Sequence, residues 1–134
     1  MALNQNAPLT VGVATTQTAT VVTGQAGYIV MPFRGRIIQA GSVLGAATTT
    51  ADSTVTVSIA GTAVTGGNWV ITQSGSAAGD HDYAATNDSG ANTVITGASN
   101  TNIFNKNDLI KFALTGTGTA GAPLSLYMHY QKLG

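Results

Sequence analysis

Three segments of the chain alternate clearly between a large apolar residue and a mostly polar one, and this alternation most constrains the fold. The segments cover residues 54–59, 109–115 and 123–131. Their apolar members are Val55, Val57, Ile59, Ile110, Phe112, Leu114, Leu124, Leu126, Met128 and Tyr130. A period of two places these side chains on one face of a strand and the polar ones on the other. We therefore expect a β-strand with one buried face in each segment.

The composition also favours strands over helices. Of the 134 residues, 21 are Thr, none is Glu, and only five are Lys or Arg. β-Branched residues suit strands, whereas Glu, Lys and Arg are among the better helix formers. Weaker strand patterns occur at residues 9–14, 18–23, 27–32, 36–44, 69–73 and 92–96, and turn-forming groups such as Gly66-Gly67-Asn68 separate them. Eight or nine short strands predict an all-β fold. The expected architecture is a single-domain antiparallel β-sandwich of jelly-roll-like type.

Two segments do not fit the strand pattern. Residues 1–8 are expected to form an extended N-terminal arm, and residues 9–134 the sandwich domain. Within that domain, residues 74–92 are polar, rich in Gly and Ala, and show little apolar periodicity. We interpret this stretch as a long loop that crosses one end of the sandwich.

Charged residues are scarce, which excludes several classes of function. The chain has five acidic and five basic residues, a net charge of zero at pH 7 and no cysteine. Without a basic cluster, the surface cannot neutralise the phosphates of a nucleic acid. No apolar run reaches the roughly 18 residues of a membrane helix, and the first residues show no secretory signal. A surface with so few hydrated ions is suited to being covered by another protein, because little desolvation of charge opposes the contact.

One acidic segment contains the residues that most suggest chemistry. Asp80, His81, Asp82 and Asp88 lie close together in the sequence. Oxygen ligands at short spacing can bind a hard cation such as calcium. However, a calcium loop counted from Asp80 would have Ala85 where glycine is required, and the chain contains no Glu to act as a bidentate ligand. We therefore expect a solvated, outward loop without a metal.

No catalytic arrangement is apparent in the sequence. Nothing resembles the Gly-x-Ser-x-Gly turn of a hydrolase, so we expect no enzyme, no small-molecule substrate and no cofactor. His129 lies beside Tyr127 on the polar face of its strand and is either a pH-sensitive interface residue or an ordinary one. Trp69 begins a strand after a turn, and it either covers the core or offers a platform for a sugar.

The two arginines of the chain lie close together. Arg34 and Arg36 flank Gly35 and follow Phe33. In an alternating strand, both would point to the same side. Arg forms bidentate bonds to carboxylates and is enriched at interfaces. The pair is therefore either a contact for a partner protein or a solubilising feature at a strand start.

Several stretches follow one another in a characteristic order. They are FRGRIIQA at residues 33–40, STVTVSIAGT at 53–62 and NDLIKF at 107–112, which leads through a Gly/Thr turn into PLSLYMHY at 123–130. Over residues 28–131, this order resembles that of small head decoration, or cement, proteins of tailed bacteriophages. Such proteins are typically jelly-roll or immunoglobulin-like, are often trimeric, and reinforce the capsid lattice where major capsid subunits meet.

The resemblance implies a structural virion protein that is made in the bacterial cytoplasm. It would bind the outside of a phage capsid as a symmetric oligomer, a trimer, and bridge subunits of the major capsid protein. Neither nucleic acid nor a membrane would be a partner. The expected capsid contacts are Leu3, Leu9, Phe33, Arg34 and Arg36, and the outward loop would carry Asp80, His81, Asp82 and Asp88. The alternatives are a fibre or tail module with a lectin-like sandwich that binds host glycans through Trp69, Tyr83 and the acidic loop, and a secreted adhesin.

Overall fold

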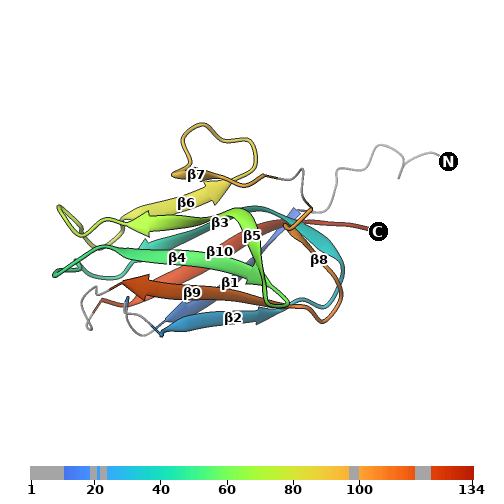
Figure 1. Ribbon diagram of the computed structural model, residues 1–134, viewed down its shortest axis with the longest axis horizontal. Coiled ribbons are helices and arrows are strands. Elements are labelled where there is room, and N and C mark those ends of the chain that lie inside the picture. Colours follow the sequence, from blue (N-terminus) through green and yellow to red (C-terminus); the bar gives the residue numbers. More distant parts are fainter. Residues whose placement is uncertain (1–10, 19–20, 22–23, 97–99, 117–121) are drawn as a thin grey trace.

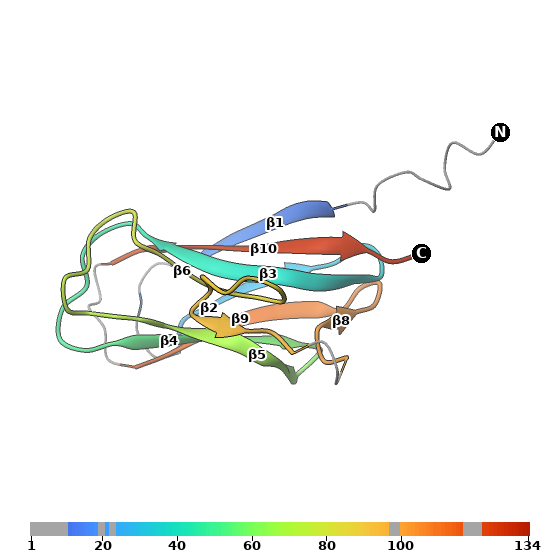
Figure 2. The same ribbon diagram turned by 90° about the horizontal axis from the view of Figure 1, so that it is seen from above.

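In the computed structural model, the chain folds into two β-sheets that face each other (Figures 1 and 2). The structure describes residues 11–18, 21, 24–96, 100–116 and 122–134. Within these ranges the chain forms ten strands and no helix. None of the described residues therefore belongs to a helix that could cross a membrane.

The strands are short and follow one another closely along the chain. They are β1 (Val11–Thr18), β2 (Ala26–Val30), β3 (Gly35–Leu44), β4 (Ser53–Ile59), β5 (Thr62–Ile71), β6 (His81–Ala85), β7 (Thr93–Val94), β8 (Ile103–Phe104), β9 (Leu109–Gly116) and β10 (Leu124–Lys132).

The strand order is that of a jelly roll. The larger sheet has the order β1-β10-β3-β6-β7, with β8 paired to β3, and the smaller sheet has the order β2-β9-β4-β5. Without the two-residue strands β7 and β8, this leaves β1-β10-β3-β6 facing β2-β9-β4-β5, the eight-stranded double sheet of a jelly roll. Figure 2 shows the sheets as two layers. The predicted fold class is confirmed, and the short β6–β7 pair is parallel rather than antiparallel.

The core lies between the sheets and consists of the alternating residues of the strands. The apolar members of the three segments with clear alternation are buried, and Tyr130 is half-buried against them. Trp69 is also a core residue, because only 1% of it is exposed. Its Nε1 donates to the Oγ of Ser42, 2.8 Å away in the opposite sheet. The Trp69 ring is therefore not available as a platform for a sugar.

The structure differs from the sequence-based expectation in two places. Residues 74–92 are not one loop, because β6 lies within them and pairs with β3 in the larger sheet. The expected turn at Gly66-Gly67 is instead an irregularity inside β5, where the register with β4 shifts. At Gly66 the backbone has a φ of 78°, and a Cβ atom would lie 2.0 Å from the carbonyl oxygen of Val94. Glycine is thus required where β7 crosses β5.

Deleting one core ring tests whether this packing supports the fold. Phe112 is fully buried, and Phe112→Ala leaves a cavity that should lower the free energy of unfolding by about 3–5 kcal/mol. Val70→Thr, on the exposed side of β5, should change it by less than about 0.5 kcal/mol. Urea unfolding of both variants measures the difference, and a small effect of Phe112→Ala would contradict this description of the core.

Candidate functional site

The edge strands β1 and β2 expose an unusual amount of apolar surface. Each is the outer strand of its sheet, and the two lie in contact along one side of the sandwich. Four of their side chains are 53–60% exposed, namely those of Val11, Val13, Tyr28 and Val30. Leu109 of β9, which pairs with Val30, is exposed as well. Neither strand contains a charged residue. Lys111 of β9 pairs with Tyr28, and its Nζ lies 6.0 Å from the centroid of the Tyr28 ring, so one charged group borders this patch. Natural proteins usually protect sheet edges with charge, proline or bulges, so two apolar edge strands without a charged residue are a candidate protein interface.

A second candidate surface lies on the outer face of the larger sheet, where four rings gather. The centroids of His81 and Tyr83 are 4.8 Å apart with nearly parallel planes. Tyr127 of β10 lies 5.5 Å from His81 and 5.0 Å from His129. The rings come from β6 and β10, which both pair with β3. They therefore form a continuous strip across three strands.

The Tyr127 ring is placed by a glycine. Gly41 lies opposite Tyr127 in β3 and opposite Tyr83 in β6. A Cβ atom at Gly41 would lie 2.5 Å from the Tyr127 hydroxyl oxygen and 2.7 Å from two ring carbons. The ring therefore lies over the backbone of β3, where only glycine leaves room. Its hydroxyl accepts a hydrogen bond of 2.8 Å from Gln39 Nε2 and contacts His81 Nε2.

The segment that follows β6 is fixed by carboxylate hydrogen bonds. The Tyr83 hydroxyl donates to Asp88 Oδ2 at 2.7 Å, and the Gly90 N–H donates to Asp88 Oδ1 at 2.8 Å. Both bonds lower the pKa of Asp88, and the bond from Tyr83 has the larger effect. The Asp88 carboxylate in turn raises the pKa of Tyr83. Asn92 Nδ2 donates to Asp82, but burial outweighs that bond and raises the pKa of Asp82.

A cleft of about 580 Å³ opens beside the start of β3. Its lining residues are Arg36, Ile38, Thr86, Asn87, Ile95, Asn102 and Gln131. Asn102 is 1% exposed and donates from Nδ2 to the carbonyl oxygen of Ile37 at 3.0 Å. Its Oδ1 is buried without a hydrogen-bond partner among the described residues. A buried acceptor without a donor is costly. Because this oxygen is shielded from solvent, a group bound in the cleft would not contact it in this structure.

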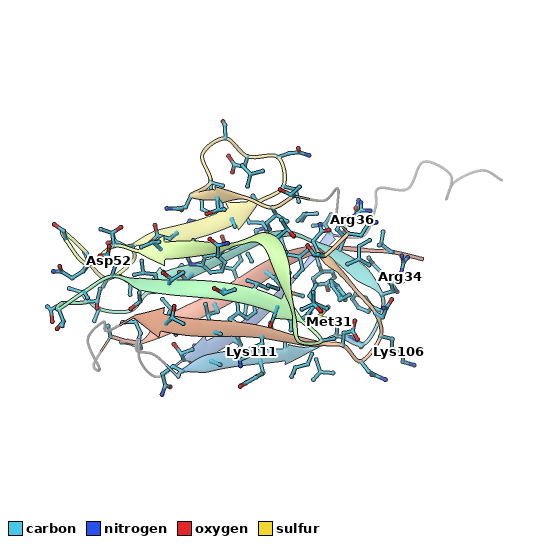
Figure 3. The ribbon with its side chains drawn as sticks, viewed as in Figure 1. Met31, Arg34, Arg36, Asp52, Lys106 and Lys111 are labelled. Carbon is cyan, nitrogen blue, oxygen red and sulfur yellow. The ribbon has the colours of Figure 1, made fainter. Side chains whose placement is uncertain are left out.

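The residues that were predicted as capsid contacts have different surroundings in the structure. Arg36 lies in β3 and lines the cleft, whereas Arg34 is exposed just before the strand. In Figure 3 both lie at the same end of the sandwich as Lys106, and Asp52 lies at the other end. Phe33 is half-buried, with its ring 5.4 Å from that of Tyr130 and Lys132 Nζ 5.0 Å from its centroid. Leu3 and Leu9 lie outside the described residues, as does the predicted arm.

The four residues predicted for one outward loop do not share one. Asp80 precedes β6 and accepts from the Ala77 N–H, while His81 and Asp82 belong to β6. Asp88 follows the strand, so the prediction of a single loop is wrong over residues 81–85. In the described part of the chain, no three His, Asp, Glu or Cys residues gather in a way that could hold a metal ion.

The sequence did not reveal the cleft or the ring strip. It placed Tyr127 and His129 correctly on the polar face of their strand, but it gave no pairing partner for that strand. The neighbours Gln39, Gly41 and His81 follow only from the register of β3 with β10 and β6. Asn102 lies beside β3 because Ile37 N donates to its carbonyl oxygen, a contact between residues 65 positions apart.

Comparisons with known proteins support the fold and no family. No protein-family model matches the chain, and no curated protein matches it significantly. A chain of the cyanophage Pam1 capsid asymmetric unit is 13% identical with a TM-score of 0.52, over 96% of this chain and 89% of that one. At this identity, the similarity shows a shared fold alone.

Two further solved structures are similar at lower scores. A CBM36-1 domain of a xylanase from the hindgut metagenome of Trinervitermes trinervoides is 10% identical with a TM-score of 0.48, over 92% of this chain and 99% of the domain. A family 43 arabinoxylan arabinofuranohydrolase of Bacillus subtilis is 17% identical with a TM-score of 0.48. The match covers 84% of this chain and only 20% of that enzyme.

Replacing Tyr83 by Phe tests the hydrogen bonding of Asp88. The variant keeps the ring beside His81 but removes the donor that stabilises the carboxylate, so the pKa of Asp88 should rise toward its ordinary value. A lowered folded-state pKa stabilises the protein above the unfolded-state pKa, and this stability is lost as pH falls through the folded-state pKa. That contribution should shrink in Tyr83→Phe. NMR titration of the Asp88 carboxyl carbon measures the shift; Tyr28→Phe is the control, and an unchanged pKa in Tyr83→Phe would contradict the assignment.

Proposed function

We propose that this protein is a non-catalytic structural protein of a phage virion, where it decorates the capsid surface as a symmetric oligomer. One observation carries the proposal, namely the uncharged edge strands β1 and β2 with their exposed apolar side chains. Protein interfaces are depleted of charge at their centre and enriched in aromatic residues such as Tyr28. β1 is an edge strand of the larger sheet, and an extended segment of a partner protein can add a strand to such an edge.

The low charge of the whole surface supports the same function. Ten charged residues are spread over an accessible surface of 6752 Å². A surface of this kind loses little free energy of hydration when it is covered. Decoration of a lattice repeats each weak contact by symmetry, and multivalent binding raises the apparent affinity without a tighter single contact. The protein would thus stabilise the shell by bridging major capsid subunits.

We place the shell contact at the end of the sandwich where β1 begins. Val11 pairs with Gln131 there, and Arg34 lies exposed at the same end (Figure 3). The arm with Leu3 and Leu9 would reach the shell together with Arg34, whose guanidinium can bind a carboxylate of the capsid protein. Phe33 packs on the core but stays partly exposed, so it would contribute to this contact as well.

The alternative function is a fibre or tail module that binds host glycans, for which the sequence suggested Trp69 as the platform for a sugar. Trp69 is buried, so its ring cannot stack on a sugar. Tyr83 and Tyr127, which are partly exposed on the outer face of the larger sheet, would have to replace it.

The oligomer is testable by introducing charge at the apolar edge. Analytical ultracentrifugation of the full chain at micromolar concentration should show a trimer. Val13→Lys and Val30→Lys each place an ammonium group in the interface and should raise the dissociation constant by about tenfold or more. Val70→Lys introduces the same charge on β5, at the opposite edge of the smaller sheet, and should leave the mass unchanged. A wild-type monomer at high concentration would overturn the oligomer.

Shell binding needs a separate measurement. Wild-type protein should co-sediment with empty shells assembled from the major capsid protein of the same virus, and it should raise their thermal stability. Arg34→Gln should weaken this binding about tenfold, as expected for a charge-assisted hydrogen bond. Lys106→Gln removes the same charge nearby and serves as the control. Failure of the wild-type protein to bind any such shell would refute the capsid function.

A further inference from the structure

We infer that the outer face of the larger sheet is a binding site for an acidic saccharide, with its carboxylate at Arg36 and a sugar ring on Tyr127. This site borders the β1–β2 edge, because His129 and Tyr127 pair with Val13 and Thr15 of β1, and it goes beyond a structural role on a capsid. The inference stands on the cleft beside β3, the Arg36 side chain that lines it and the ring that lies over Gly41.

A bulge in β3 brings the cleft and the ring onto one face. The register with β10 shifts between His129, which pairs with Gln39, and Tyr130, which pairs with Ile37. Ile38 is therefore an extra residue in the strand. Because of it, Arg36, Ile38 and Gln39 all avoid the core, while Ile37 is buried.

The cleft and the ring are close enough for one ligand. Arg36 lines the cleft, and Gln39 hydrogen-bonds the Tyr127 hydroxyl. Three residues of strand span about 10 Å. A ligand of two or more sugar rings can therefore contact the cleft and Tyr127 together.

The lining of the cleft selects a ligand that both donates and accepts hydrogen bonds. The carboxamides of Asn87 and Gln131 and the hydroxyl of Thr86 can each do both. Ile38 and Ile95 add apolar surface, as is usual in small-molecule sites. The hydroxyl groups of a saccharide donate and accept as well, so they match these side chains.

Arg36 adds the preference for an acid. No acidic residue lines the cleft, and among the described residues Arg36 forms no ion pair. Its guanidinium donates in a fork that matches a carboxylate. A simple carboxylate would leave the carboxamides of Asn87 and Gln131 without a polar ligand group, and a neutral sugar would leave Arg36 without an anion. A uronic acid residue offers a partner to both.

Tyr127 provides the second contact. Its ring covers Gly41, and glycine within a strand often marks a place where another group approaches closely. The partly exposed ring offers an apolar face on which the C–H face of a sugar can pack. Gln39 and His81, which hold the hydroxyl of Tyr127, lie at the rim of this face and can bond sugar hydroxyls.

The test is an NMR titration of the isotope-labelled full chain with tetragalacturonate, neutral cellotetraose and capped glutamate. Tetragalacturonate should shift amides in residues 36–41, 86–95 and 127–131 and bind at least about tenfold more tightly than the other two probes, since bonds to a charged group contribute that much. Arg36→Gln should remove this preference, whereas the charge-matched control Lys106→Gln should keep it. Tyr127→Ala should lower the affinity for both saccharides by about two- to tenfold.

Each other outcome overturns the inference. Equal affinity for cellotetraose would exclude the acidic preference, and equal affinity for capped glutamate would identify a peptide carboxylate as the ligand. Binding that survives Arg36→Gln, or amide shifts confined to other strands, would place the site elsewhere. If Arg36→Gln fails to fold, as its amide spectrum would show, the comparison of the three probes on wild-type protein still decides. None of these outcomes depends on whether the protein binds a capsid.

Discussion

The structure depends on the burial of alternating side chains between two sheets. Because the period of a strand is two, each buried residue fixes its neighbours on the outer face, and a slip of one residue would exchange the two sets. The bond from Trp69 to Ser42 joins the sheets in the middle of this core and satisfies two polar groups that burial would otherwise leave unpaired. The exposed surfaces are thus a consequence of the packing inside.

Most surface residues in this molecule are small and uncharged, so its features of interest are local. The β1–β2 edge is apolar and open, and it suits a flat contact with protein. The outer face of the larger sheet is different, because it combines rings, carboxamides and one guanidinium around a concave region. The two surfaces therefore suit different kinds of contact.

The sequence predicted the strands whose inward residues are large. Residues 54–59, 109–115 and 123–131 were assigned correctly because Val, Ile, Leu, Phe and Met alternate there with polar residues. β6 was missed because its buried residues, Ala84 and Ala85, are too small to give an apolar signal. A strand of this kind is held by its place in the sheet, and tertiary pairing outweighs local preference.

The candidate site was beyond single-sequence reasoning for a related reason. Its members come from β3, β10, the segment after β6 and the segment before β8, and only strand pairing brings them together. The bulge at Ile38 was also invisible, although it decides which side chains of β3 leave the core. The sequence analysis singled out the two arginines as a possible partner contact, but it could not show that Arg36 lines a cleft and Arg34 is exposed.

Gly41 gives the outer face its shape by what it lacks. A mid-strand glycine weakens a sheet, since it adds backbone freedom to the unfolded chain and packs no side chain. Because Gly41 has no Cβ atom, the Tyr127 ring of the neighbouring strand β10 can pack directly against the backbone of β3. A larger side chain at this position would project from the outer face of the sheet. The shape of the surface that a bound molecule would contact therefore depends on the absence of a side chain at this one position.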